Sequence, residues 1–120
     1  MVALLEETDR AVVTDVCRRS GWDVSFAESC AEARALLERV KAQIVFMDRD
    51  LAGTDWRDAM TSLAGLRAQP CIVLISRVLD VYLWYEVVRY GGYEILAKPL
   101  RADEVSRVVR LAWSYQNSSY

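Results

Sequence analysis

The sequence predicts one α/β domain, a three-layer doubly wound (βα)5 sandwich in which helices cover both faces of a parallel five-stranded sheet. Two observations predict this fold class. Five short apolar runs lack polar alternation, which is typical of strands buried on both faces, and segments with helical periodicity separate them. Right-handed crossovers then place helices on both sides of the sheet. We expect residues 1–120 to form this single domain, with no output domain after it.

The five expected strands are short and mostly apolar. They span residues 2–5, 24–27, 44–47, 71–75 and 95–97. Glycines stand between these runs or at the ends of the helical segments, where turns and helix ends need them. The chain therefore alternates regularly between strands and helices.

Four helical segments each carry one apolar stripe toward a core. In chain order the stripes are Val12, Val13, Val16 and Cys17; Ala33, Leu37 and Val40; Trp56, Ala59, Met60 and Leu63; and Val105, Val108, Val109, Ala112 and Trp113. Ser29 and Glu32 form a capping-box pattern that predicts the start of the second helix.

The helix expected within residues 78–90 has an unusual composition. Its only charged residues are Asp80, Glu86 and Arg89, and its apolar residues cannot all face one core. The segment includes the aromatic residues Tyr82, Trp84 and Tyr85. A surface patch of tyrosine and tryptophan is typical of protein interfaces. Two interpretations stay open: a partner or dimer surface formed with the last strand and the last helix, or an edge helix with a few exposed aromatic residues.

Composition excludes several classes of function. Fifteen Lys and Arg residues stand against seventeen Asp and Glu without a dense basic run, so nucleic acid is not an expected partner. Three cysteines without CxxC spacing and the absence of histidine argue against zinc sites and histidine triads. No apolar run approaches the roughly 18 residues of a membrane span, and the first residues do not resemble a secretory signal. We expect a cytoplasmic protein without a membrane partner.

Polar and charged residues follow four of the expected strands. In chain order these are Glu6 and Glu7, then Asp48 and Asp50, then Ser76 and Arg77, and finally Lys98. In an open α/β sheet, ligands bind beyond the carboxyl ends of the strands. Lysine is scarce in this chain, with Lys41 the only other one, and a compact ammonium suits one oxygen of a phosphate or carboxylate. We expect these side chains to form one anion- and cation-binding site.

At these positions the sequence resembles the receiver domain of bacterial two-component response regulators, over essentially the whole chain. The resemblance is strongest at residues 44–48 with 50–55, and at residues 92–100, where Lys98 precedes Pro99. The spacings from Asp48 to Ser76 and from Ser76 to Lys98 also fit this family. The resemblance implies a CheY-like, flavodoxin-like sheet of strand order 2-1-3-4-5.

The resemblance also implies roles for the site residues. Asp48 would accept a phosphoryl group from a phosphohistidine on a sensor histidine kinase or phosphotransfer protein, while Ser76 and Lys98 would each contact a phosphoryl oxygen. Glu6, Glu7, Asp48 and the backbone carbonyl of Asp50 occupy the positions that hold Mg²⁺ in the family. Mg²⁺ prefers such hard oxygen ligands, and phosphoryl transfer depends on charge neutralisation. The domain would be a phosphoacceptor that assists its own phosphorylation and dephosphorylation, not an enzyme.

Several positions depart from the family pattern, among them Ala52 and Trp56, where the family often has Pro and Gly. Glu7 stands where the family has Asp, and its longer side chain puts the affinity for Mg²⁺ in question. Arg77 replaces a small residue and could cover the pocket, clasp a phosphoryl group, or turn to solvent. The family's switch aromatic is replaced by Ile95, with Tyr93 two residues earlier on what the period of two predicts to be the same strand face.

Three functions follow from this pattern. The leading one is a stand-alone receiver that signals through the face formed by the fourth helix, fifth strand and fifth helix, toward a downstream protein or in a homodimer. The alternative is a phosphorylation-independent pseudo-receiver that docks or dimerises constitutively, which Glu7, Arg77 and Ile95 favour. A flavin-binding electron carrier is disfavoured, because Glu6 and Glu7 stand where a flavin phosphate would need a loop rich in Ser, Thr or Gly.

Overall fold

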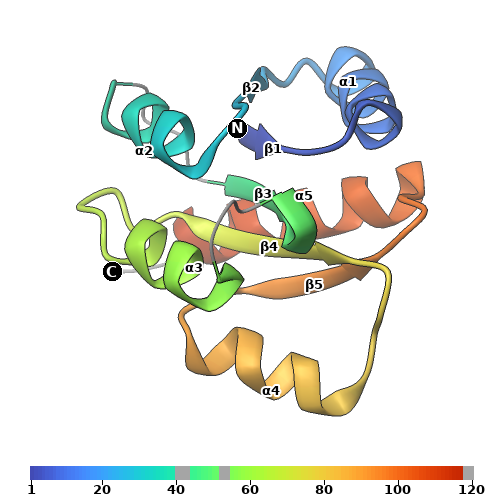
Figure 1. The fold of residues 1–120 in the computed structure, drawn as a ribbon. Helices are drawn as coiled ribbons and strands as arrows, with labels where there is room; N and C mark the ends of the chain where they lie inside the picture. The colour runs from blue at the N-terminus through green and yellow to red at the C-terminus, as the bar shows by residue number, and fades with distance from the viewer. Residues whose placement is uncertain (40–43, 52–54, 118–120) are drawn as a thin grey trace.

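A computed structural model of the chain describes residues 1–39, 44–51 and 55–117. Strands and helices alternate along the chain, and one sheet lies between two layers of helices (Figure 1). The predicted α/β sandwich is confirmed. Val40 and the motif residues 52–54 lie outside the described residues.

All five strands are parallel, in the order β2-β1-β3-β4-β5 that the resemblance implies. They span Val2–Leu4 (β1), Ser25–Phe26 (β2), Ile44–Asp48 (β3), Cys71–Ser76 (β4) and Glu94–Ala97 (β5). β1 and β2 are shorter than the apolar runs predict. In β1 the last paired residue is Leu4, although the next residue, Leu5, is still buried. The winding direction reverses between β1 and β3, so the site expected at the switch point lies at their carboxyl ends.

The helices divide between the two faces of the sheet (Figure 1). They are α1 (Glu7–Ser20), α2 (Cys30–Arg39), α3 (Trp56–Ala64), α4 (Val81–Arg89) and α5 (Ala102–Asn117), with a short 3-10 helix, η1 (Arg49–Leu51), after β3. Helices α1 and α5 pack on one face, and α2, α3 and α4 pack on the other. No helix in the described ranges has the length and apolarity that a bilayer crossing requires.

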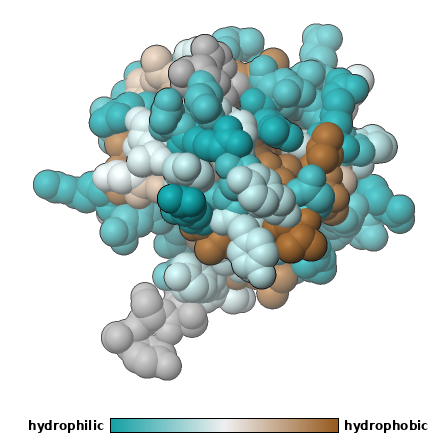
Figure 2. All heavy atoms as spheres, turned by 60° about the horizontal axis from the view of Figure 1, so that its bottom comes forward, coloured by the Kyte–Doolittle hydropathy of each residue, from teal (hydrophilic) through white to brown (hydrophobic). Residues whose placement is uncertain are grey.

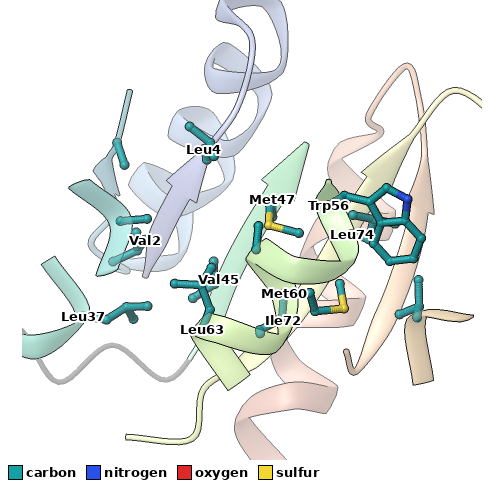
Figure 3. Packing of buried hydrophobic residues seen from close by; sticks show 14 of the residues in the cluster. Val2, Leu4, Leu37, Val45, Met47, Trp56, Met60, Leu63, Ile72 and Leu74 are labelled. Carbon is teal, nitrogen blue, oxygen red and sulfur yellow. The ribbon is translucent and has the colours of Figure 1, made fainter. Parts of the chain in front are cut away.

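Each face of the sheet has its own apolar core, because neighbouring residues of a strand point to opposite faces. Phe46 of β3 packs with the residues of α1 and α5, whereas Val45 and Met47 pack toward α3. Figure 3 shows the second of these cores, where Met60 and Leu63 of α3 lie over the sheet. The central strands are therefore buried on both sides, as their continuous apolarity predicts.

Local signals set the helix ends. The Asp55 carboxylate accepts a hydrogen bond from the Arg57 backbone N–H at the start of α3, and the Asp80 carboxylate accepts one from the Leu83 N–H at the start of α4. Gly21 ends α1 with a positive φ of 73°, a conformation that favours glycine. The predicted cap at Ser29 is present, since its hydroxyl accepts a hydrogen bond from the Glu32 N–H at 3.1 Å.

One residue of a predicted core stripe lies outside the core. Trp113 is 56% exposed, whereas Val105, Val108, Val109 and Ala112 of the same stripe are buried. At 100° per residue, position 113 lies at the margin of the stripe that the other four define. The buried stripe of α5 is therefore narrower than the apolar stripe that the sequence predicts.

Candidate functional site

The carboxyl ends of the sheet bring three predicted site residues together. Asp48 is the last residue of β3 and Ser76 the last residue of β4, and both side chains are buried. Lys98 follows β5, and its backbone N–H donates to the Ser76 carbonyl at 3.0 Å. Its side chain is only 8% exposed, so the ammonium lies inside the site and not at the surface.

The Lys98 ammonium contacts three carboxylates. Its Nζ forms an ion pair with Asp48 Oδ2 and lies 3.2 Å from Asp9 Oδ2 and 3.3 Å from Glu6 Oε2. Burial lowers the pKa of Lys98, but hydrogen bonds and charges from Asp48 and Asp9 outweigh burial and raise that pKa above its ordinary value. Lys98 therefore stays charged at neutral pH.

The three carboxylates fit a hard divalent cation. One oxygen from each of Glu6, Asp9 and Asp48 lies within 4.8 Å of the others. Together they carry three negative charges, of which the single ammonium of Lys98 neutralises one, and an all-oxygen donor set is what Mg²⁺ prefers. The side chains present therefore match the metal that the sequence predicts, although not with the predicted set of ligands.

The structure places Glu7 away from this cluster. Glu7 is exposed at the first position of α1, and Asp9 is buried beside Lys98 in its place. Residues three apart lie on one side of a helix and adjacent residues do not, so the first turn of α1 aligns Asp9, not Glu7, with Glu6. The expected acidic pair Glu6 and Glu7 is corrected to Glu6 and Asp9.

Asp50 lies two residues after Asp48 in the chain, and Ser76 ends the neighbouring strand β4, but their polar atoms have local partners. The Asp50 backbone N–H donates to Asp48 Oδ1 at 2.8 Å, while its own side chain is exposed. The Ser76 hydroxyl accepts from the Val78 N–H at 3.1 Å. The Asp50 contact holds Oδ1 of Asp48 in place, so Oδ2 is the oxygen that faces the Lys98 ammonium.

Arg77 borders the entrance to the site. Its side chain is 68% exposed, and its guanidinium lies 3.7 Å from Glu6 Oε2. A shallow pocket of about 400 Å³ lies between Arg77, Asp9, Lys98 and Pro99. Of the three possibilities for Arg77, this position at the rim agrees best with a side chain that is largely in solvent and weakly paired with Glu6.

The structure corrects the expected geometry of the switch position. Ile95 is buried in the core beneath α2, α3 and α4, whereas Tyr93 packs against the opposite core and its ring lies 5.5 Å from that of Tyr115 in α5. β5 begins at Glu94, so Tyr93 precedes the strand and the period of two does not apply to it. The two residues therefore do not share a face.

The aromatic residues of α4 are at the surface. Tyr82, Trp84 and Tyr85 are 75%, 43% and 64% exposed, whereas Leu83 and Val87 fill the core. Both interpretations of this helix, a partner or dimer surface and an edge helix with exposed aromatic residues, place aromatic side chains in solvent, and the structure has them there. Figure 2 shows this side of the molecule, where apolar and aromatic residues gather.

Comparison with known proteins agrees with this fold. The family model described as the response regulator receiver domain matches residues 6–110. No similar sequence is found among curated proteins.

Solved structures of response regulators have a similar fold. A response regulator from Thermotoga maritima is 21% identical, with a TM-score of 0.83 over 94% of this chain and 96% of that one. Chemotaxis response regulator CheY4 of Vibrio cholerae is 13% identical, with a TM-score of 0.82 over 92% of this chain and 94% of that one. NtrX from Brucella abortus is 22% identical, with a TM-score of 0.82 over 95% of this chain but only 26% of NtrX. The chain thus spans about a quarter of NtrX.

Proposed function

The chain belongs to the receiver domain family of response regulators, and from this premise we propose that Asp48 accepts a phosphoryl group from a phosphohistidine on a sensor histidine kinase or a phosphotransfer protein. Receiver domains are signalling domains, and this one acts as a phosphorylation switch in the cytoplasm. The observation that carries the proposal is the buried ion pair of Lys98 with Asp48, flanked by Asp9 and Glu6.

The reaction needs an anionic oxygen that faces the donor. Asp48 supplies it, since Oδ1 is held by the Asp50 N–H and Oδ2 lies in the charged cluster. The carboxylate attacks phosphorus, the bond from phosphorus to the imidazole nitrogen breaks, and the imidazole leaves with that electron pair. The product is an acyl phosphate on Asp48.

Lys98 and Ser76 hold the transferred group. The Lys98 ammonium, already at Asp48, neutralises charge on one phosphoryl oxygen, and the Ser76 hydroxyl at the end of the neighbouring strand donates to another. The same hydroxyl accepts from the Val78 N–H, in the segment before α4. A shift of Ser76 toward the phosphoryl group would therefore act on this segment and on the helix that follows it.

Mg²⁺ is the cofactor of the proposed function. Glu6, Asp9 and Asp48 would hold it together with the backbone carbonyl of Asp50. A bound Mg²⁺ supplies charge neutralisation to the phosphoryl oxygens. Lys98 contacts the same three carboxylates and limits their mutual repulsion.

The output of the switch is a protein contact on the face of α4, β5 and α5. The exposed aromatic residues of α4 support this assignment, because tyrosine and tryptophan are enriched at protein interfaces. Phosphorylation adds about −1.5 to −2 charges at Asp48, which draws Ser76 and Lys98 toward the phosphoryl group and biases α4.

Phosphorylation of Asp48 is tested with a small acyl-phosphate donor and intact-mass spectrometry. We expect the wild-type chain to gain one phosphoryl group in the presence of Mg²⁺ and none after chelation. Asp48→Asn removes the nucleophilic carboxylate and abolishes labelling. Asp50→Asn is the matched control, because its side chain is exposed and only its backbone contacts Asp48. Labelling that persists in Asp48→Asn would refute this acceptor.

A phosphorylation-independent docking module remains the second candidate. The observation that favours it is the burial of Ile95 in the core, where no aromatic side chain can swing between two positions as the family's switch residue does. In this case α4 binds its partner whether or not Asp48 is modified. Equal partner binding by the wild type and by Asp48→Asn, with phosphodonor present, distinguishes this candidate from the switch.

A further inference from the structure

Arg10 of α1 holds the ends of the two neighbouring strands β1 and β2. Its Nε donates to the Leu5 carbonyl at 2.8 Å, and its Nη2 donates to the Ala27 carbonyl at 3.4 Å. The guanidinium also lies over the Phe26 ring, 5.2 Å from the ring centroid. Leu5 directly follows β1, and Ala27 directly follows β2. One side chain therefore ties both strand ends to the helix that follows β1.

The contact with Leu5 satisfies a buried backbone group. Leu5 is 1% exposed and lies beyond Leu4, the last paired residue of β1. A buried carbonyl needs a donor from the protein, because water does not reach it. The Arg10 side chain is itself only 25% exposed, so solvent competes little for this charge-assisted hydrogen bond. Loss of the guanidinium would leave the turn after β1 without this anchor.

The segment between Leu5 and Arg10 carries two of the three carboxylates of the site, Glu6 and Asp9. Arg10 closes this segment in two ways. Its backbone N–H donates to the Glu6 carbonyl at 2.9 Å, and its side chain reaches back to the Leu5 carbonyl. The Asp9 N–H donates to the same Glu6 carbonyl at 3.0 Å. The directions in which Glu6 and Asp9 leave the backbone are thus set within a turn whose two ends Arg10 joins.

The start of α1 lacks the side-chain anchor that other helices have. Asp55 and Asp80 cap α3 and α4 through their carboxylates, whereas Glu6, at the same position of α1, makes no such hydrogen bond. The Glu6 carboxylate instead lies 3.3 Å from the Lys98 ammonium, inside the site. Another group must therefore fix the first turn of α1, and the guanidinium of Arg10 is placed to do so.

Arg10 does not act on the carboxylates by direct contact. Among the described residues its only ion pair is with Glu28, at 3.0 Å, and the Glu28 side chain is 72% exposed. At longer range, a positive charge near three carboxylates disfavours the binding of a cation. The position and the charge of Arg10 therefore have opposite effects on cation binding, and an experiment can separate them.

We propose that Arg10 is a positioning residue for the bound cation, because it fixes the turn between β1 and α1 so that Glu6 and Asp9 converge with Asp48. The proposal rests on the part of the proposed function that assigns Mg²⁺ to these three carboxylates, and it names the residue that holds two of them in place. It does not require phosphorylation of Asp48. Removal of such an outer partner commonly lowers metal affinity by about 10- to 100-fold.

Calorimetric titration of the full chain with Mg²⁺, without phosphodonor, tests this role. Arg10→Met keeps a long side chain and removes the guanidinium, and we expect its dissociation constant for Mg²⁺ to rise about tenfold or more. Removal of a positive charge alone would lower that constant, so the direction of the change separates position from charge. Arg10→Lys keeps the charge but loses the fork of donors, and its affinity should lie between those of the wild type and Arg10→Met.

Two matched variants control for the ion pair and for stability. Glu28→Gln removes the exposed partner and leaves the backbone contacts of Arg10 in place, so its Mg²⁺ affinity should stay within about twofold of the wild type. Val108→Ala weakens the core beneath α1 and α5 from a position outside the turn. It should lower the midpoint of unfolding in urea without a change in the dissociation constant for Mg²⁺.

Each outcome of the titrations has one meaning. An Arg10→Met chain that circular dichroism shows to be folded and that binds Mg²⁺ as tightly as the wild type, or more tightly, overturns the proposal. So does an equal loss of affinity in Glu28→Gln or Val108→Ala, because the effect would then come from the ion pair or from stability. If Arg10→Met does not fold, wild-type affinity in Arg10→Lys overturns the proposal. A wild type that binds no Mg²⁺ overturns it together with the metal site, whereas normal Mg²⁺ binding without labelling of Asp48 counts only against the phosphoacceptor.

Discussion

Asp9 is the site residue that a scan of the strand ends overlooks. The scan selects residues that directly follow an apolar run, which gives Glu6 and Glu7. The chain is already helical at Glu7, however, so side-chain direction follows a period of 3.6 and position 9 turns back toward position 6. The spacing of three between two acidic residues is a signal in the sequence, but it is useful only if the helix start is placed correctly.

Asp9 and Glu7 therefore provide a matched pair of variants for metal binding. We expect Asp9→Asn to weaken Mg²⁺ binding about tenfold or more, because it removes one of three carboxylates from the cluster. Glu7→Gln should bind Mg²⁺ with nearly unchanged affinity, since Glu7 is exposed outside the cluster. Calorimetric titration of each variant with Mg²⁺ measures the difference. A larger loss in Glu7→Gln than in Asp9→Asn would make Glu7, and not Asp9, the metal ligand.

Other site residues are predictable from the sequence for a simple reason. Asp48, Ser76 and Lys98 end or follow parallel strands, and parallel strands place their carboxyl ends at one edge. Strand position alone therefore brings them together. The packing of Tyr93 is not predictable in this way, because it depends on where β5 begins, and a shift of one residue exchanges the two faces.

At the scale of elements, α3 and α4 are joined by Arg57. Its guanidinium hydrogen-bonds Glu86 of α4 at 2.5 Å and Asp55 at the start of α3 at 3.3 Å, and it stacks over the Trp56 ring. The Glu86 side chain is only 16% exposed, so solvent screens this pair less than an ordinary surface pair. α3 is the first α-helix after β3, which ends at Asp48, and the ion pair therefore joins this helix to α4.

Loss of this ion pair should loosen α4 selectively. We expect Glu86→Gln to speed amide hydrogen exchange in α4 several-fold while exchange in α5 is unchanged, because the helix then depends mainly on Leu83 and Val87 for its attachment. Asp15→Asn is the matched control, since it removes an exposed ion pair with Arg19 inside α1. Equal exchange of α4 in the wild type and in Glu86→Gln would show that the ion pair does not hold the helix.

The composition of α4 by itself indicates an interface, but not which residues form it. Both the inner and the outer side of the helix contain apolar residues, and the residue types alone do not distinguish inner from outer. Exposure makes the distinction: Val81 and Tyr85 are mostly in solvent, while Leu83 is buried. The aromatic residues fall on the outer side because the space between α4 and the sheet is filled by the smaller aliphatic side chains.

For the whole molecule, the fold follows from the pattern of apolar residues. Five strands without polar alternation require cover on both faces, and the intervening segments supply amphipathic helices of the right length. Only the strand order needs the family resemblance, since burial alone permits several orders of five parallel strands. Exact boundaries are less predictable, as β1 and β2 show, because pairing ends before burial does.

We expect the two cores to unfold as one cooperative unit, because each central strand contributes alternate residues to both. Leu63→Ala removes a fully buried side chain from the core beneath α3, and we expect it to lower the free energy of unfolding by about 2–5 kcal/mol. Val108→Ala weakens the opposite core beneath α5. In both variants tryptophan fluorescence and far-ultraviolet circular dichroism should report one coincident transition in urea. Two separate transitions in either variant would mean that each face of the sheet, with its helices, unfolds independently of the other.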